Sequence, residues 1–198
     1  MIMGLDPGLT VTGLVLLETD GPTVIDALTL RPPKSCANAR AKASWITEAA
    51  WRIIQVEHPQ VLAIEEGHVP HYGQQRPDLP LALAAQVGYV PRDESSRSEG
   101  RAAAALKTAE LRGSLVRLAD GTDCEVMGVT AAEAQRALTG DGRSLPREQR
   151  KRAMLQAARM QFPEVKWTQD SADALGVALA CRGKLWREAI AVAAQRRA

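Results

Sequence analysis

Three short apolar runs separated by turn signals occupy the first thirty residues, and this pattern constrains the fold more than any other. The runs are Met1–Leu5, Thr12–Leu17 and Thr23–Leu30. A Pro-Gly pair follows the first run and an Asp-Gly-Pro turn follows the second. Runs of this length bounded by Gly and Pro are typical of β-strands. We therefore expect an antiparallel three-stranded meander at the start of the chain.

A helix and a buried strand are expected next. Apolar residues recur at helical spacing from about Cys36 to Glu57, and His58 and Pro59 end this segment. Val61–Glu65 is short and almost continuously apolar, as expected of a parallel strand that is buried on both faces. We expect this strand to lie beside the first one.

The remainder of the chain alternates helices with one more strand. The expected elements are a helix Arg101–Leu118, a strand Cys124–Met127, a helix from Thr130 to the break at Gly140, a helix of about Pro146–Met160, and one or two helices from Ser171 to the end, with a break possible at Gly183. Thr130 and Glu133 form a capping-box pattern. Residues 68–100 are rich in proline and polar side chains, so we expect an inserted loop at about 73–100, with a short helix at Leu79–Val90.

Composition sets the class of protein. The 198 residues, 45% of them hydrophobic, are enough for a single α/β domain (1–198) with helices on both sides of a sheet. The three cysteines, Cys36, Cys124 and Cys181, are widely spaced and form no CxxC pair, which fits free thiols in a reducing compartment. No apolar stretch has the length of a signal peptide or membrane span. We expect a cytoplasmic protein with no membrane partner.

Four acidic residues carry the clearest functional signal. Asp6 closes the first apolar run and Glu65 closes the buried strand. Asp170 and Asp173 open the last helix three residues apart, which places them on one side of it. We expect all four to converge on one oxygen-ligand site for a divalent cation and phosphate chemistry. Without metal, such a cluster should be destabilising or partly protonated.

Other roles are open for each acid. Glu66 could replace Glu65, but adjacent strand residues point to opposite faces, so only one of them can share the side of Asp6. Asp170 could be the N-cap of the last helix. Asp6 could serve only in the turn before Pro7.

Basic residues cluster although the net charge is only +2. One group comprises Arg143, Arg147, Arg150, Lys151 and Arg152, and a second comprises Arg182, Lys184, Arg187, Arg196 and Arg197. Arg143 follows Gly140-Asp141-Gly142, where a glycine backbone lets a phosphate approach closely. Four residues of the first group, Arg143, Arg147, Arg150 and Lys151, predict a wall for a nucleic-acid backbone. Solvated helix faces are the alternative interpretation of both groups.

Five segments, in order, resemble the RuvC family of Holliday-junction resolvases, which belong to the ribonuclease H-like superfamily. They are Gly4–Gly13, Ala63–Glu66, Leu106–Gly113, Leu138–Arg143 and Asp170–Leu175. The resemblance covers most of the chain outside about 72–100. It implies a mixed five-stranded sheet, an antiparallel meander plus parallel strands, flanked by helices. It also implies a metal-dependent crossover junction endodeoxyribonuclease that resolves four-way DNA junctions by paired nicks, leaving 5′-phosphate and 3′-hydroxyl ends.

The resemblance also assigns roles. It selects Glu65 over Glu66, with Asp6 bridging two Mg²⁺ ions roughly 4 Å apart, for which Mn²⁺ can substitute. Glu65 and Asp173 would be flanking ligands, and Asp170 a ligand or a water-positioning group. The implied DNA-binding residues are Arg136, Arg143, Arg147, Arg150, Lys151, His68, Tyr72 and Lys107. A homodimer formed through Arg101–Leu118 and a branch-migration helicase partner are expected as well.

Two segments depart from the family pattern. Where the family has lysines around the Gly-x-Gly loop, this chain has Gln135 and Arg136 before it and Pro146 and Arg147 after it. An aromatic residue that stacks at the junction centre is replaced by His68, with His71 and Tyr72 close behind.

Three alternative functions follow from the same residues. One is a nuclease for other branched or RNA-containing duplexes. Another is an actin- or sugar-kinase-type nucleotide-binding protein with Asp6–Gly13 as its phosphate loop, although the chain is too short for the two halves of that fold. The third is a DNA-binding scaffold without activity, which the presence of all four acids disfavours.

Overall fold

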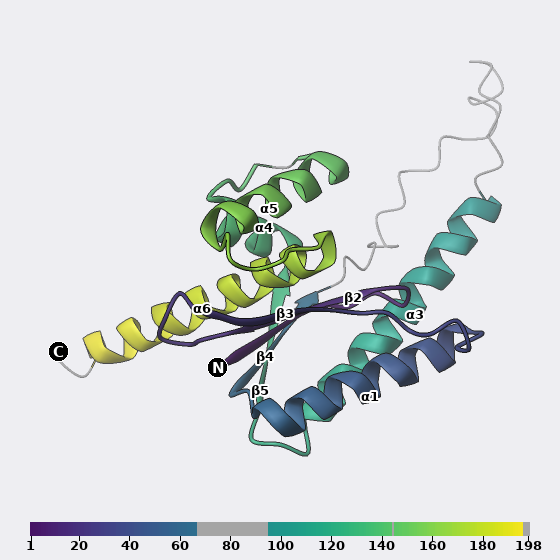
Figure 1. Ribbon diagram of the computed structural model, residues 1–198, viewed down its shortest axis with the longest axis horizontal. Helices are drawn as coiled ribbons and strands as arrows, with labels where there is room; N and C mark the ends of the chain where they lie inside the picture. The colour runs from purple at the N-terminus through teal and green to yellow at the C-terminus, as the bar shows by residue number, and fades with distance from the viewer. Residues whose placement is uncertain (67–94, 144, 196–198) are drawn as a thin grey trace, which may run out of the picture.

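The computed structural model describes residues 1–66, 95–143 and 145–195 (Figure 1). The strands are β1 (Ile2–Asp6), β2 (Thr12–Leu17), β3 (Val24–Leu30), β4 (Val61–Glu66) and β5 (Glu125–Thr130). The helices are α1 (Ala39–Glu57), α3 (Ser95–Ala119), α4 (Ala131–Thr139), α5 (Arg147–Gln161) and α6 (Gln169–Gln195).

The strands form one mixed sheet in the order β3-β2-β1-β4-β5. β1, β2 and β3 pair antiparallel, whereas β1 pairs with β4 and β4 with β5 in parallel. The predicted meander, the buried parallel strand beside β1 and the mixed five-stranded sheet are therefore confirmed. Because β1, β4 and β5 run in the same direction, their carboxyl ends meet at one edge of the sheet.

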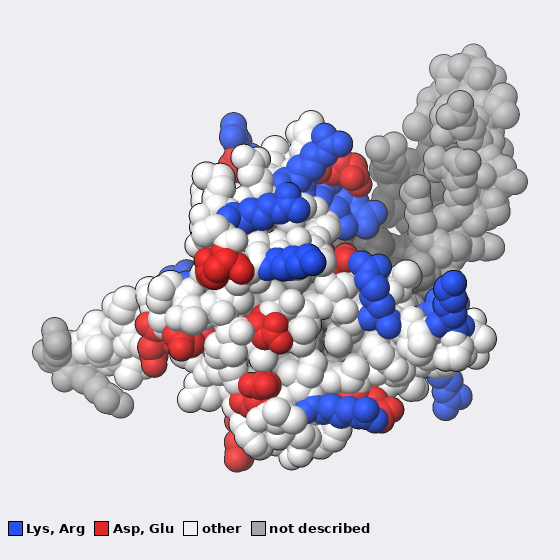
Figure 2. All heavy atoms as spheres, viewed as in Figure 1, with Lys and Arg blue, Asp and Glu red and all other residues white. Residues whose placement is uncertain are grey.

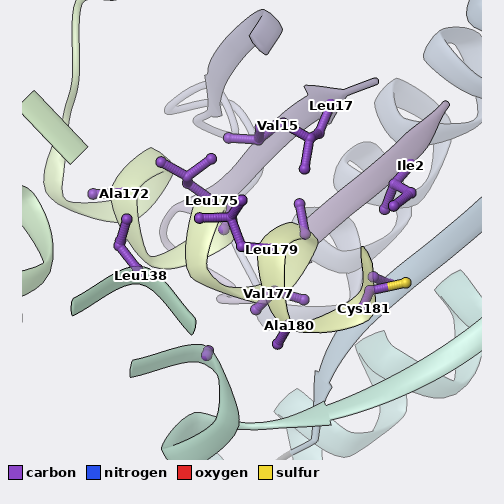
Figure 3. Close-up of a cluster of buried hydrophobic side chains, with 14 of the residues drawn as sticks. Ile2, Val15, Leu17, Leu138, Ala172, Leu175, Val177, Leu179, Ala180 and Cys181 are labelled. Atoms are coloured by element: carbon purple, nitrogen blue, oxygen red, sulfur yellow. The ribbon is translucent and has the colours of Figure 1, made fainter. Parts of the chain in front are cut away.

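Helices cover both faces of the sheet (Figure 1). The first face carries α1 and α3, where Met3, Leu5 and Leu62 pack against Ile46 and Leu111. The second face carries α4, α5 and α6. There Ile2, Val15, Leu17, Val61 and Ala63 pack against a run of buried α6 residues that includes Leu175, Val177 and Ala178 (Figure 3). Successive strand residues therefore serve opposite cores, as the period of two requires.

Small residues let α6 lie close to the sheet. A Cβ atom added to Gly4 would stand 2.6 Å from the carbonyl oxygen of Ala174 and 2.8 Å from the Cβ of Ala178. One added to Gly13 would overlap the carbonyl oxygen of Asp170. Gly13 is the register partner of Asp6. The first turn of α6 is therefore held directly above the end of β1.

Thr168 and Ser171 cap the start of α6. The Ser171 N–H donates to the Thr168 hydroxyl (3.1 Å), and the Thr168 N–H donates to the Ser171 hydroxyl (3.0 Å). The Thr168 hydroxyl also hydrogen-bonds that of Thr29 in β3. α6 thus begins at Gln169, earlier than expected, and continues through Gly183 without a break. Asp170 does not cap this helix, because Thr168 does.

Other boundaries differ modestly from those expected. α1 begins at Ala39, where the Asn38 side chain accepts from the Ala41 N–H. α3 begins at Ser95, so the last part of the expected insertion belongs to a helix. The remaining insertion, including the expected helix 79–90, lies outside the described residues.

Local details of the remaining elements agree more closely. The capping box of Thr130 and Glu133 forms as predicted. All three cysteines are free thiols. Among the helices of the described chain, none combines the length and the apolarity that a membrane span requires.

Candidate active site

A small cavity of about 140 Å³ opens where the carboxyl ends of β1 and β4 meet α5 and α6. Three predicted acids line it, Asp6, Glu65 and Asp173, together with three predicted cations, Arg147, Arg150 and Lys151. Ala131, Ala134 and Met154 complete its wall. Side chains from positions 6, 65 and 173 thus share one site, because strand order and the position of α6 place them together.

Glu65, rather than Glu66, shares the side of Asp6. Glu66 is exposed, and its side chain lies beside Gly128 of β5. Glu65 is hydrogen-bonded to Asp6. Burial, and then the charge of Asp6, raises the pKa of Glu65 to about 8. At neutral pH Glu65 is therefore protonated and donates to Asp6, whose own pKa is raised by burial.

Asp173 lies on the first turns of α6 and faces the same cavity. Burial, and then the charge of Asp6, raises its pKa to about 7. The Gln169 side chain donates to Asp173 Oδ1 (3.3 Å) and to the carbonyl oxygen of Lys151 (2.9 Å). Lys151 Nζ lies 4.0 Å from Asp173 Oδ2. Gln169 therefore links the acid on α6 to the basic helix α5.

Asp170 stands apart from the other three acids. It does not line the cavity, and its Oδ2 lies 3.8 Å from the guanidinium of Arg31. Its charge still contributes to raising the pKa of Asp6. The structure thus places Asp170 near the site but outside the cavity.

One cation near the acids was not predicted from the sequence. Arg112 belongs to α3 on the other face of the sheet, yet its charge lowers the pKa of both Asp6 and Glu65. Its Nε is buried without a hydrogen-bond partner among the described residues. No motif singles out Arg112, because its distance from the acids depends on how α3 crosses the sheet.

The predicted DNA-binding residues fall into several places. Arg143 lies on the loop after α4, where its guanidinium is bound by Asp141 at 2.7 Å. The buried Gln135 side chain donates to the carbonyl oxygens of Asp141 (3.1 Å) and Arg143 (2.7 Å). Gln135 therefore fixes the loop that carries Arg143.

The other predicted contacts lie away from the cavity or cannot be placed. Arg136 is exposed and lines a second groove, between α4 and α6. Lys107 lines a groove between α1 and α3 on the opposite face of the sheet. His68 and Tyr72, with His71, lie outside the described residues. Figure 2 shows several Lys and Arg side chains over α4 and α5.

The donor set of the cavity fits a hard divalent cation. Its acids offer only oxygen, the ligand that Mg²⁺ and Mn²⁺ prefer. Burial raises the pKa of all three, so a bound cation would favour their charged forms. As the side chains stand, no three Asp, Glu, His or Cys side chains in the described ranges have metal-binding geometry. Binding therefore requires Glu65 to lose its proton and the carboxylates to turn toward one point.

The sheet order and the two helix layers define a ribonuclease H-like α/β fold. Neither protein-family models nor curated protein sequences match the chain. Among solved structures, RuvC of Thermus thermophilus in complex with a Holliday junction substrate is similar, with a TM-score of 0.61, 18% identity and 90% of each chain covered. A second structure of Thermus thermophilus RuvC gives a TM-score of 0.57 at 18% identity, covering 90% of this chain and 91% of that one. The chain therefore has a RuvC-like fold.

Proposed function

We propose that this protein is a divalent-metal-dependent endonuclease that resolves four-way DNA junctions by paired nicks, leaving 5′-phosphate and 3′-hydroxyl ends. One observation carries the proposal. Three acids and three cations line a single cavity at the edge of a RuvC-like sheet. The acids provide oxygen ligands, and the cations provide positive charge for a phosphodiester. RuvC of Thermus thermophilus, which has this fold, has been seen in complex with a Holliday junction substrate.

Each part of the cavity has a proposed task. Asp6, Glu65 and Asp173 would hold Mg²⁺ or Mn²⁺, which activates water and neutralises charge on the phosphate when bound. Asp170, at the rim, is the proposed fourth acid and orients water or a ligand. Arg147, Arg150 and Lys151 draw the scissile phosphate toward the acids and balance its charge.

The remaining assignments extend this proposal to the whole substrate. Two symmetric nicks need two sites, so we propose a homodimer with its interface on Arg101–Leu118. Arg136, Arg143, Lys107, His68 and Tyr72 are proposed further DNA contacts. A branch-migration helicase is a proposed partner.

Cleavage of a substrate panel tests the function. Four-way junctions, flaps, RNA–DNA hybrids and linear duplexes would be incubated with the protein in Mg²⁺ or Mn²⁺, and the nicks mapped. We expect symmetric nicks in the junction and slow cutting of the linear duplex. Equal rates on hybrids or linear duplexes would instead indicate a different nuclease. Thermal stabilisation by ATP without any DNA cleavage would indicate a nucleotide-binding protein.

Binding measurements test the basic wall. Charge reversal at Arg147, Arg150 and Lys151 should weaken junction binding and flatten its dependence on salt, since each lost phosphate contact removes about 0.9 from the logarithmic slope. Unchanged binding curves would place the DNA elsewhere on the protein.

A further inference from the structure

A second groove, of about 630 Å³, lies between α4 and the distal half of α6. Four cations line it, Arg136, Arg182, Lys184 and Arg187, with Glu133 as the one acid among its described lining residues. It opens on the other side of α4 from the acidic cavity: Ala131 and Ala134 line the cavity, whereas Glu133, Arg136 and Ala137 line the groove. The two sites are thus separate, although α4 and α6 contribute residues to both.

Most of the positive charge in this groove is unbalanced. Lys184 pairs with Glu133 at 3.1 Å, so these two charges offset each other. Arg182 donates to the carbonyl oxygen of Gly21, which is neutral. Arg136 and Arg187 are exposed and have no carboxylate partner among the described residues. Three of the four cations that line the groove therefore have no acid to neutralise them among the described residues.

An aromatic side chain fixes one of these groups. The Arg182 guanidinium lies 5.6 Å from the ring centroid of Trp186, whose side chain is 52% exposed. Arginine held in this way is suited to phosphate, because the planar guanidinium can bind two oxygens at once. The groove therefore combines one positioned guanidinium group with an exposed aromatic ring.

We propose that this groove binds the phosphate backbone of a junction arm that is not being cut. The proposal rests on the proposed function, which makes a branched DNA the substrate. At a rise of 1.5 Å per residue, Trp186 lies about 20 Å along α6 from Asp173, a span of about six base pairs. Because α4 stands between the two sites, DNA in the cavity needs a second arm, leaving in another direction, to reach the groove. A four-way junction has such an arm, whereas a linear duplex does not.

The test compares junction and linear DNA binding by the full-length protein in chelator, so that no cleavage occurs. We expect the double variant R136A/R187A to bind a four-way junction about tenfold more weakly at moderate salt, with the logarithmic salt slope reduced by about two. Binding to a linear duplex of equal length should be unchanged.

A matched control removes the same charge elsewhere. Arg159 of α5 and Lys166, between α5 and α6, are exposed cations that line neither the cavity nor the groove. R159A/K166A should bind the junction like wild type. Wild-type junction affinity in R136A/R187A, or an equal loss in the control, would overturn the proposal. An equal loss on linear and branched DNA would overturn the assignment to a second arm.

Tryptophan fluorescence gives a second, independent measurement. Junction DNA should quench the emission of the wild type more than that of W186F, which keeps a ring at this position. Equal quenching in both proteins would count against the groove. Quenching by a polyglutamate peptide and not by the junction would assign the groove to an acidic protein partner and overturn the proposal. One outcome separates this proposal from the proposed function. If R136A/R187A loses junction binding but the wild type shows no metal-dependent cleavage, the proposed function is refuted and the groove is still a DNA-binding site.

Discussion

The two faces of the sheet are packed by different means. On the α1 and α3 face, large aliphatic side chains such as Met3, Leu5 and Leu111 interlock. On the α6 face, Gly4 and Gly13 meet the helix backbone directly. The first face can therefore adjust side-chain conformations when a neighbour changes, whereas the second fixes a backbone position. Because Asp170 and Asp173 lie on that fixed first turn of α6, close packing on this face sets the geometry of the proposed site.

Among single substitutions, the largest effect on stability is expected on the α1 and α3 face, which carries none of the cavity acids. Leu111 is fully buried, so Leu111→Ala should destabilise the protein by about 2–5 kcal/mol through lost burial and a residual cavity. Denaturant unfolding measures this change. The nicking rate per folded molecule should nevertheless stay near that of wild type. A rate loss beyond the loss of folded protein would mean that both faces position the site.

A smaller stability change with a larger effect on activity is expected on the α6 face. Gly13→Ala places a methyl group against the Asp170 carbonyl, which should cost about 1–3 kcal/mol and shift the first turn of α6. Metal-dependent nicking should fall far more than stability. Gly183→Ala, also on α6, is the control: its nearest side-chain contact is 3.5 Å away, and a helical Gly-to-Ala change should stabilise by up to about 1 kcal/mol. A wild-type nicking rate in Gly13→Ala would contradict the claim that close packing of α6 on the sheet sets the geometry of the site.

A pH dependence of stability is expected from the cavity acids, whose side chains lie on the α6 face of the sheet. In the folded protein the pKa of Glu65 is about 8, against 4.5 ordinarily, and that of Asp173 is about 7, against 3.8. The folded state thus binds more protons than the unfolded state, so stability should fall as pH rises from about 4.5 to 8. Thermal unfolding in chelator should show this fall, and Glu65→Gln should reduce it. If the midpoint temperature of unfolding instead rises between pH 4.5 and 8, burial does not raise the pKa of these acids.

The sequence predicts the positions of site residues on strands better than those of site residues on helices. Asp6 and Glu65 end strands whose parallel pairing follows from the apolar pattern, and alternation separates Glu65 from Glu66. The position of Asp170 depends on the Thr168 cap and on Arg31, which no local pattern indicates. Arg112 was missed because its place depends on how α3 crosses the sheet. The groove between α4 and α6 likewise arises only from tertiary packing.

The most direct test compares two neighbouring acids on opposite faces of β4. Glu65→Gln and Glu66→Gln make the same chemical change, but only the first alters the cavity. Nicking of a four-way junction would be mapped for both variants in Mg²⁺ and Mn²⁺, with junction affinity measured in parallel. We predict that Glu65→Gln abolishes metal-dependent nicking and keeps or improves affinity, while Glu66→Gln cuts at the wild-type positions and rate. Full cleavage by the Glu65 variant would contradict the assignment of this cavity as the active site.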